Sequence, residues 1–174
     1  MFMHLNQTRA AAGTALMAAL STILLLLGTF IPVNTLFFTA MAAYLIGYTI
    51  SRYGLKYGAA QLVLCVLLDF FLNPDKVHWG LYLCLGGYIF LCELVFAKWN
   101  HIEDQKKKLR FQLVCNWGLF QVIFVPILLF FRSFFPMFDM PAGTFLLWLA
   151  GQLGWIVYDK AYRVFISMLR ERKL

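Results

Sequence analysis

The residues of this chain that are most able to do chemistry are polar side chains set inside long apolar segments. They are the amide and carboxylate groups of Gln61, Asp69, Glu93, Asn116, Gln121 and Gln152. Each is costly to place in hydrocarbon, so such groups usually face a cavity or a partner. Asp69 lies one turn from the end of its segment and could reach water, and Glu93 could be neutralised by Lys98. For Glu93 we favour this structural role.

The sequence contains no set of residues that suits nucleophilic or metal catalysis. The few serines and histidines have no spacing that pairs a nucleophile with a base, and there is no HExxH motif. No CxxC occurs among the four cysteines, which all lie in apolar runs and are interpreted as small buried residues: Cys65, Cys84, Cys92 and Cys115. We therefore expect a protein that is not an enzyme and that uses no metal or other cofactor.

A second group of polar and aromatic residues lies at the other ends of the apolar segments, opposite the ends that carry the basic clusters. Tryptophan and tyrosine at such ends are most often anchors at the membrane interface. On the alternative interpretation they line a pocket, in which aromatic faces stack a small organic ligand and polar groups orient it. The candidate substrate-binding residues are then Asn34, His78, Trp79, Tyr82, Gln121, Arg132, Trp148 and Gln152.

The elements that must position these residues are membrane helices. Of the 174 residues 62% are hydrophobic and only 13% charged, whereas soluble domains carry about 25% charged residues. No charge lies between Arg9 and Arg52, a stretch long enough for two crossings that turn at Pro32. We expect an all-α fold, a single transmembrane domain built as a six-helix bundle with spans at about 11–30, 35–51, 57–72, 79–97, 111–131 and 142–159.

The distribution of basic residues predicts the orientation of the bundle. All of the 15 Lys and Arg except Lys76 and Arg132 fall at one set of segment ends, together with both termini. Because short cytoplasmic loops retain Lys and Arg, both termini are predicted to be cytoplasmic. The net charge of +7 is explained by a rim that faces anionic lipid, without a nucleic-acid partner.

The basic tail at 160–174 is amphipathic at helical spacing. It is consistent with a helix along the membrane interface, or with an extension of the last span into water. At the start of this tail Asp159 and Arg163 are four residues apart and are predicted to form an ion pair.

The first apolar segment opens with RAAAGTALMAAL, which places Ala11, Ala15 and Ala19 on one helical face. Small residues at this spacing allow another helix to approach closely. That helix belongs either to this chain or to a partner protein, and the spacing alone favours this chain.

These features together resemble the substrate-binding S components of energy-coupling factor transporters. The resemblance rests on six spans in about this length, the alanine stripe, a proline-containing turn and the segment YGLKYGAAQLVLCVLLDFFL. In this family Gly, a basic residue and Gly open the third span and an acidic residue lies near its far end, matched here by Gly54, Lys56, Gly58 and Asp69.

The resemblance implies a subunit of the bacterial cell membrane that binds a vitamin-like micronutrient from outside and delivers it. The partners would be a transmembrane coupling subunit, which contacts the alanine stripe, and two cytoplasmic ATPases. The chain departs from the family pattern at its first outer loop, essentially Pro32 to Asn34, which leaves little lid over a pocket. The alternative is a scaffold or assembly factor of comparable size, as in the cell-shape MreD family.

Overall fold

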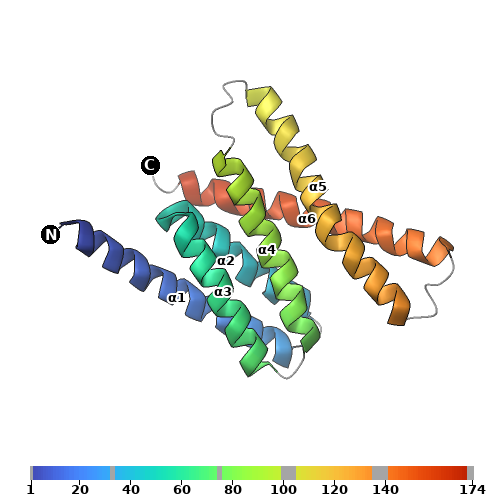
Figure 1. Ribbon diagram of the computed structural model, residues 1–174, viewed down its shortest axis with the longest axis horizontal. Coiled ribbons are helices and arrows are strands. Elements are labelled where there is room, and N and C mark those ends of the chain that lie inside the picture. The colour runs from blue at the N-terminus through green and yellow to red at the C-terminus, as the bar shows by residue number, and fades with distance from the viewer. Residues whose placement is uncertain (1, 32–33, 74–75, 99–104, 135–140, 172–174) are drawn as a thin grey trace. The chain divides into compact units, whose positions relative to one another are not determined.

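The computed structural model describes residues 2–31, 34–73, 76–98, 105–134 and 141–171, all of them in or beside helices (Figure 1). The chain divides into two compact units, Met1–Trp99 and Asn100–Leu174. The first unit holds helices α1 (Phe2–Phe30), α2 (Thr35–Tyr53), α3 (Leu55–Leu72) and α4 (Lys76–Lys98). The second holds α5 (Gln105–Phe134) and α6 (Pro141–Glu171).

Four of these helices are long and apolar enough to cross a membrane. They contain the segments Gln7–Phe30, Leu55–Leu72, His78–Lys98 and Phe111–Leu129, in α1, α3, α4 and α5. Backbone groups have no water to bind in hydrocarbon, so an uninterrupted helix is the natural state of such segments. The prediction of an all-helical membrane protein is confirmed to this extent. Spans through α2 and α6 stay predictions, as does the orientation of the termini.

Helix α2 forms the interior of the first unit, where it packs against α1, α3 and α4. Its buried residues include Ala42, Ala43 and Gly47, whose small side chains let neighbouring helices come close. Its threonines and tyrosines, together with Arg52, make it less apolar than the four candidate spans. Of these polar groups Thr39, Tyr44 and Thr49 are buried against the neighbouring helices, whereas Arg52 is exposed.

The turn between α2 and α3 is shorter than the polar loop expected around Arg52 and Lys56. Only Gly54 separates the two helices. Its φ is +99°, a backbone conformation that residues other than glycine rarely adopt. The Gly54 N–H donates to the Ile50 carbonyl, so the end of α2 remains satisfied. The chain therefore reverses within one residue, and both helices extend into the segment predicted as a loop.

The last helix is continuous from Pro141 to Glu171. The basic tail, as far as the structure describes it, is thus one helix with the preceding apolar segment. Helix α5 is also continuous although it contains Pro126, a residue that membrane helices tolerate.

Candidate functional site

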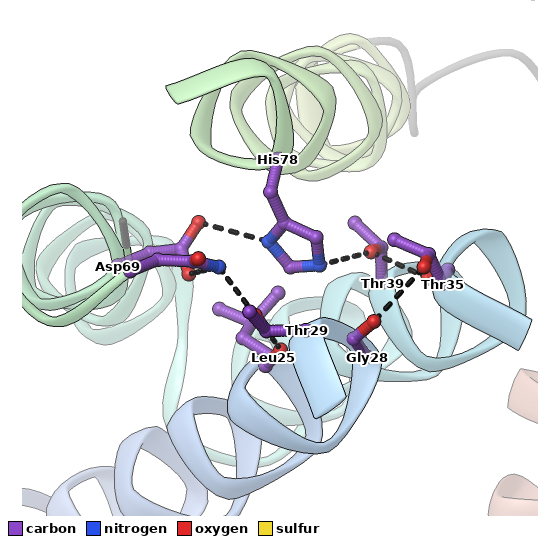
Figure 2. A network of polar contacts seen from close by, with 8 residues as sticks. Leu25, Gly28, Thr29, Thr35, Thr39, Asp69 and His78 are labelled. Atoms are coloured by element: carbon purple, nitrogen blue, oxygen red, sulfur yellow. Dashed lines mark hydrogen bonds and ion pairs between the residues drawn. The ribbon is translucent and has the colours of Figure 1, made fainter. Parts of the chain in front are cut away.

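The largest polar network of the first unit joins the end of α3 to the start of α4. It contains Asp69, Asn73 and His78 together with hydroxyl groups of α1 and α2, and we call it the Asp69–His78 cluster (Figure 2). His78 Nδ1 lies 3.3 Å from Asp69 Oδ2, and the other ring nitrogen, Nε2, lies 3.3 Å from Thr39 Oγ1. The imidazole thus lies between a carboxylate on α3 and a hydroxyl on α2.

Asn73 links the same carboxylate to α1. Its amide nitrogen lies 2.6 Å from Thr29 Oγ1 and 3.3 Å from Asp69 Oδ1. Thr29 donates its hydroxyl hydrogen to the Leu25 carbonyl, so its oxygen is free to accept from Asn73. The two carboxylate oxygens of Asp69 therefore have different partners, the Asn73 amide and the imidazole.

Helix geometry and a glycine place these groups together. Asp69 and Asn73 are four residues apart at the end of α3, so they share one face. Across from them, a Cβ atom on Gly28 would lie 3.1 Å from His78 Nε2, so a larger residue would crowd the ring. Gly28 also accepts a hydrogen bond from Thr35 Oγ1 at 2.9 Å through its carbonyl oxygen.

The cluster is closed to solvent. Asp69 is 1% exposed. Its position near a helix end had suggested that it reaches water, but in the structure it does not. His78 is 3% exposed and Tyr82 is fully buried, although both were predicted to face a ligand pocket. Their role in ligand binding stays a prediction. Asn73, which directly follows the predicted span 57–72, is a full member of the cluster.

The remaining candidates of the first unit are Asn34 and Trp79. Asn34 is exposed just before α2. Trp79 is half-buried and makes an edge contact with Phe70, with ring centroids 5.6 Å apart. Neither residue reaches the Asp69–His78 cluster through a described hydrogen bond.

Two glutamines predicted to bind substrate meet in the second unit. Gln121 Nε2 on α5 donates to Gln152 Oε1 on α6 at 3.2 Å. The same oxygen accepts from Trp117 Nε1 at 3.0 Å. We call Gln121 and Gln152 the glutamine pair, and Trp117 is its third member by hydrogen bonding. Trp117 was not among the predicted residues, although its place four residues before Gln121 puts it on the same helical face.

The indole fixes which atoms of the two amides face each other. An indole N–H is only a donor, so its partner atom on Gln152 must be the oxygen. The group of Gln121 that faces this oxygen must then be the amide nitrogen. The two remaining atoms, Gln152 Nε2 and Gln121 Oε1, are buried and have no hydrogen-bond partner in the described part of the chain.

Aromatic rings lie close to the glutamine pair along both helices. Phe120 on α5 stacks with Trp155 on α6 at a centroid distance of 5.7 Å, and with Phe124 at 4.9 Å. Nearer the start of α6, Trp148 stacks with Phe145 at 6.1 Å. The side chain of Arg132, the last predicted substrate-binding residue, lies outside the described residues.

A charged cluster ties α5 to α6 farther along. Arg163 Nε donates to Asp159 Oδ2 at 2.8 Å, which confirms the predicted ion pair. Asn116 on α5 donates to Asp159 Oδ1 at 3.1 Å. The Asp159 carboxylate is 6% exposed and the Arg163 side chain 30% exposed.

The alanine stripe of α1 is on the exposed side of that helix. Ala11, Ala15 and Ala19 are all exposed, whereas Ala18 and Ser21 on the other side are buried. Ser21 donates to the Ala42 carbonyl of α2 at 3.3 Å and accepts from Gln61 of α3 at 3.0 Å. Helices α2 and α3 thus pack against the face of α1 that carries Ser21. The helices of the first unit leave the alanine stripe uncovered.

The cysteines and acidic residues do not gather into a metal centre within the described residues. Cys65 and Cys92 are buried, Cys84 and Cys115 are half-buried, and none of the four forms a disulfide. Comparison with protein-family models, with curated proteins and with solved structures found no match.

Proposed function

We propose that the protein is a substrate-capture subunit of an energy-coupling-factor type importer for a small organic micronutrient. On this proposal the chain crosses the bacterial cell membrane six times with both ends in the cytoplasm. The observation that carries it is the glutamine pair, which leaves one buried amide donor and one buried amide acceptor without partners between α5 and α6. Buried polar atoms without partners cost free energy, and a ligand can repay that cost by binding them.

The chemistry around the pair favours an organic ligand over an ion. Gln152 offers N–H donors and Gln121 offers a carbonyl oxygen, which suits a molecule with an acceptor and a donor side by side. The stacked aromatic residues Phe120 and Trp155 lie within three positions of the glutamines in the sequence and contribute apolar surface to this segment of the two helices. Ligand sites commonly combine apolar and aromatic walls with a few polar groups that set orientation.

Ligand binding tests this proposal directly. We expect the purified full-length protein in lipid nanodiscs to bind one member of a panel of vitamins and their precursors. Gln121→Ala and Gln152→Ala each remove a hydrogen bond to that ligand, and each is expected to weaken binding about tenfold. Isothermal titration measures the affinities, and Gln112→Ala, another glutamine on α5, serves as the matched control. Equal affinity in all four proteins would contradict the assigned site.

The exposed alanine stripe supports the proposed partner. A coupling subunit that packs closely on α1 needs small side chains there. We expect Ala15→Leu to abolish co-purification with the co-expressed coupling subunit and two ATPases, without changing thermal stability. Ala60→Leu enlarges an exposed alanine on α3 and is expected to leave the complex intact. If Ala15→Leu also leaves the complex intact, the stripe is not the contact.

A scaffold is the second candidate, and the burial of His78 and Tyr82 favours it. These residues belong to a closed interior rather than to an open pocket in the first unit. A scaffold would bind none of the small molecules, so the glutamine substitutions would have no effect on its function. It would still lose its membrane-protein partners when Ala15 is replaced by leucine, which separates the two candidates.

A further inference from the structure

The hydrogens of the Asp69–His78 cluster can be counted from its geometry. The Thr39 hydroxyl carries one hydrogen and has two acceptors nearby, the Thr35 carbonyl at 2.8 Å and His78 Nε2 at 3.3 Å. The shorter contact is the normal back-bond of a helical threonine, so the hydrogen goes to Thr35. Thr39 Oγ1 then meets the ring as an acceptor, and His78 Nε2 must carry a hydrogen of its own.

The other side of the ring needs a second hydrogen. His78 Nδ1 lies 3.3 Å from Asp69 Oδ2, and two bare lone pairs at that distance would repel each other. Asn73 binds the other carboxylate oxygen and so supplies nothing to Oδ2. A hydrogen must therefore lie between Nδ1 and Oδ2, bonded to one of the two. With both hydrogens in place the pair has zero net charge.

Burial makes this state the favourable one. The two side chains are 2% and 1% exposed, and a single net charge in so dry a site is costly. No described residue that faces the pair supplies a compensating positive charge: α1 and α2 contribute hydroxyls and carbonyls. One turn farther along α3 and α4 come the thiol of Cys65 and the phenol of Tyr82.

We propose that Asp69 and His78 form a proton-binding site that holds one proton between Nδ1 and Oδ2. Binding forms one bond from the proton to Nδ1 or Oδ2, and release leaves a neutral imidazole beside an ionised carboxylate. Release also leaves one negative charge in a buried site where four helices meet. The site lies outside the glutamine pair and does not depend on the proposed function.

Nuclear magnetic resonance tests the proposal on the full-length protein in lipid nanodiscs. The substitutions His4→Gln and His101→Gln leave His78 as the only histidine. At pH 7.5 we expect the 15N resonance of Nε2 in the range of a protonated nitrogen. We also expect either Nδ1 or the 13C-labelled carboxyl group of Asp69 to be protonated. A bare Nε2, or a neutral ring beside an ionised Asp69, would overturn the site.

Asp69→Asn in the same background removes the group that holds the second proton. If the second proton lies on Nδ1, we expect the imidazole to become neutral at pH 7.5, with a downfield shift of one ring nitrogen. If it lies on Asp69, we expect the ring to stay neutral and the signal of the protonated carboxyl group to be lost. Asp159→Asn, which alters the carboxylate of the second unit, is expected to leave the His78 resonances unchanged. Where the parent spectrum places the second proton on Nδ1, identical His78 spectra in the Asp69→Asn and parent proteins would show that the carboxylate does not hold that proton in place, and would also overturn the proposal.

Discussion

Asp69→Ala is expected to destabilise the first unit by about 3–5 kcal/mol, the usual cost of removing one member of a buried ion pair. The change leaves His78 Nδ1 and the Asn73 amide without their carboxylate partner, in a site from which water is excluded. Reversible unfolding in mixed micelles, followed by circular dichroism, measures the loss. Asn34→Ala, an exposed polar residue next to α2, is expected to change stability by less than about 0.5 kcal/mol.

A double-mutant cycle separates the pair from the loss of packing. Removing both side chains eliminates the unpaired group that either single change leaves behind, so Asp69→Ala with His78→Ala should cost less than the sum of the two. We expect a coupling free energy of about 1–3 kcal/mol. Additive effects would mean that the two side chains do not interact, and would remove the basis of the proton site.

Asp159→Ala is expected to lower the stability of the α5–α6 unit by about 2–3 kcal/mol, as for the loss of hydrogen bonds to a charged group. It removes the acceptor of both Asn116 and Arg163. The cost should be smaller than for Asp69 because the Arg163 side chain is 30% exposed and can regain water. Exchange of the backbone amides of α5 and α6 measures it by mass spectrometry.

The neighbouring Lys160 provides the control for this second prediction. Its side chain is exposed, so Lys160→Ala changes the charge of α6 without breaking a described contact. We expect amide exchange in this variant to match the parent protein. Faster exchange of equal size in both variants would mean that the contacts of Asp159 contribute no more to the stability of α6 than an exposed side chain does.

Much of the helix layout could be predicted from the residues alone. The predicted starts or ends at residues 30, 35 and 72 coincide with those of α1, α2 and α3. The errors lie where the expected loops were polar, as at Gly54, because polar residues at a membrane surface can remain helical. A positive φ at one glycine was enough to reverse the chain, and composition does not reveal that angle.

The candidate sites were less predictable than the helices. The glutamines were recognised as costly groups, yet the tryptophan that fixes their amide orientation was not. Asp69 and His78 were placed in separate groups, one as a residue that reaches water and the other as a pocket residue. Their pairing depends on how α3 and α4 are rotated against each other, and on the space that Gly28 leaves for the ring.

The sequence by itself determined that this is a helical membrane protein, because hydropathy and helix-breaking residues act locally and lipid forces each apolar segment to satisfy its own backbone. Only the tertiary structure decided which polar groups meet. Pairing requires side chains on different helices to come within hydrogen-bond distance, and close packing of small residues sets that rotation. For this reason the stripe of Ala15 faces outward while Ser21, six residues later, joins three helices.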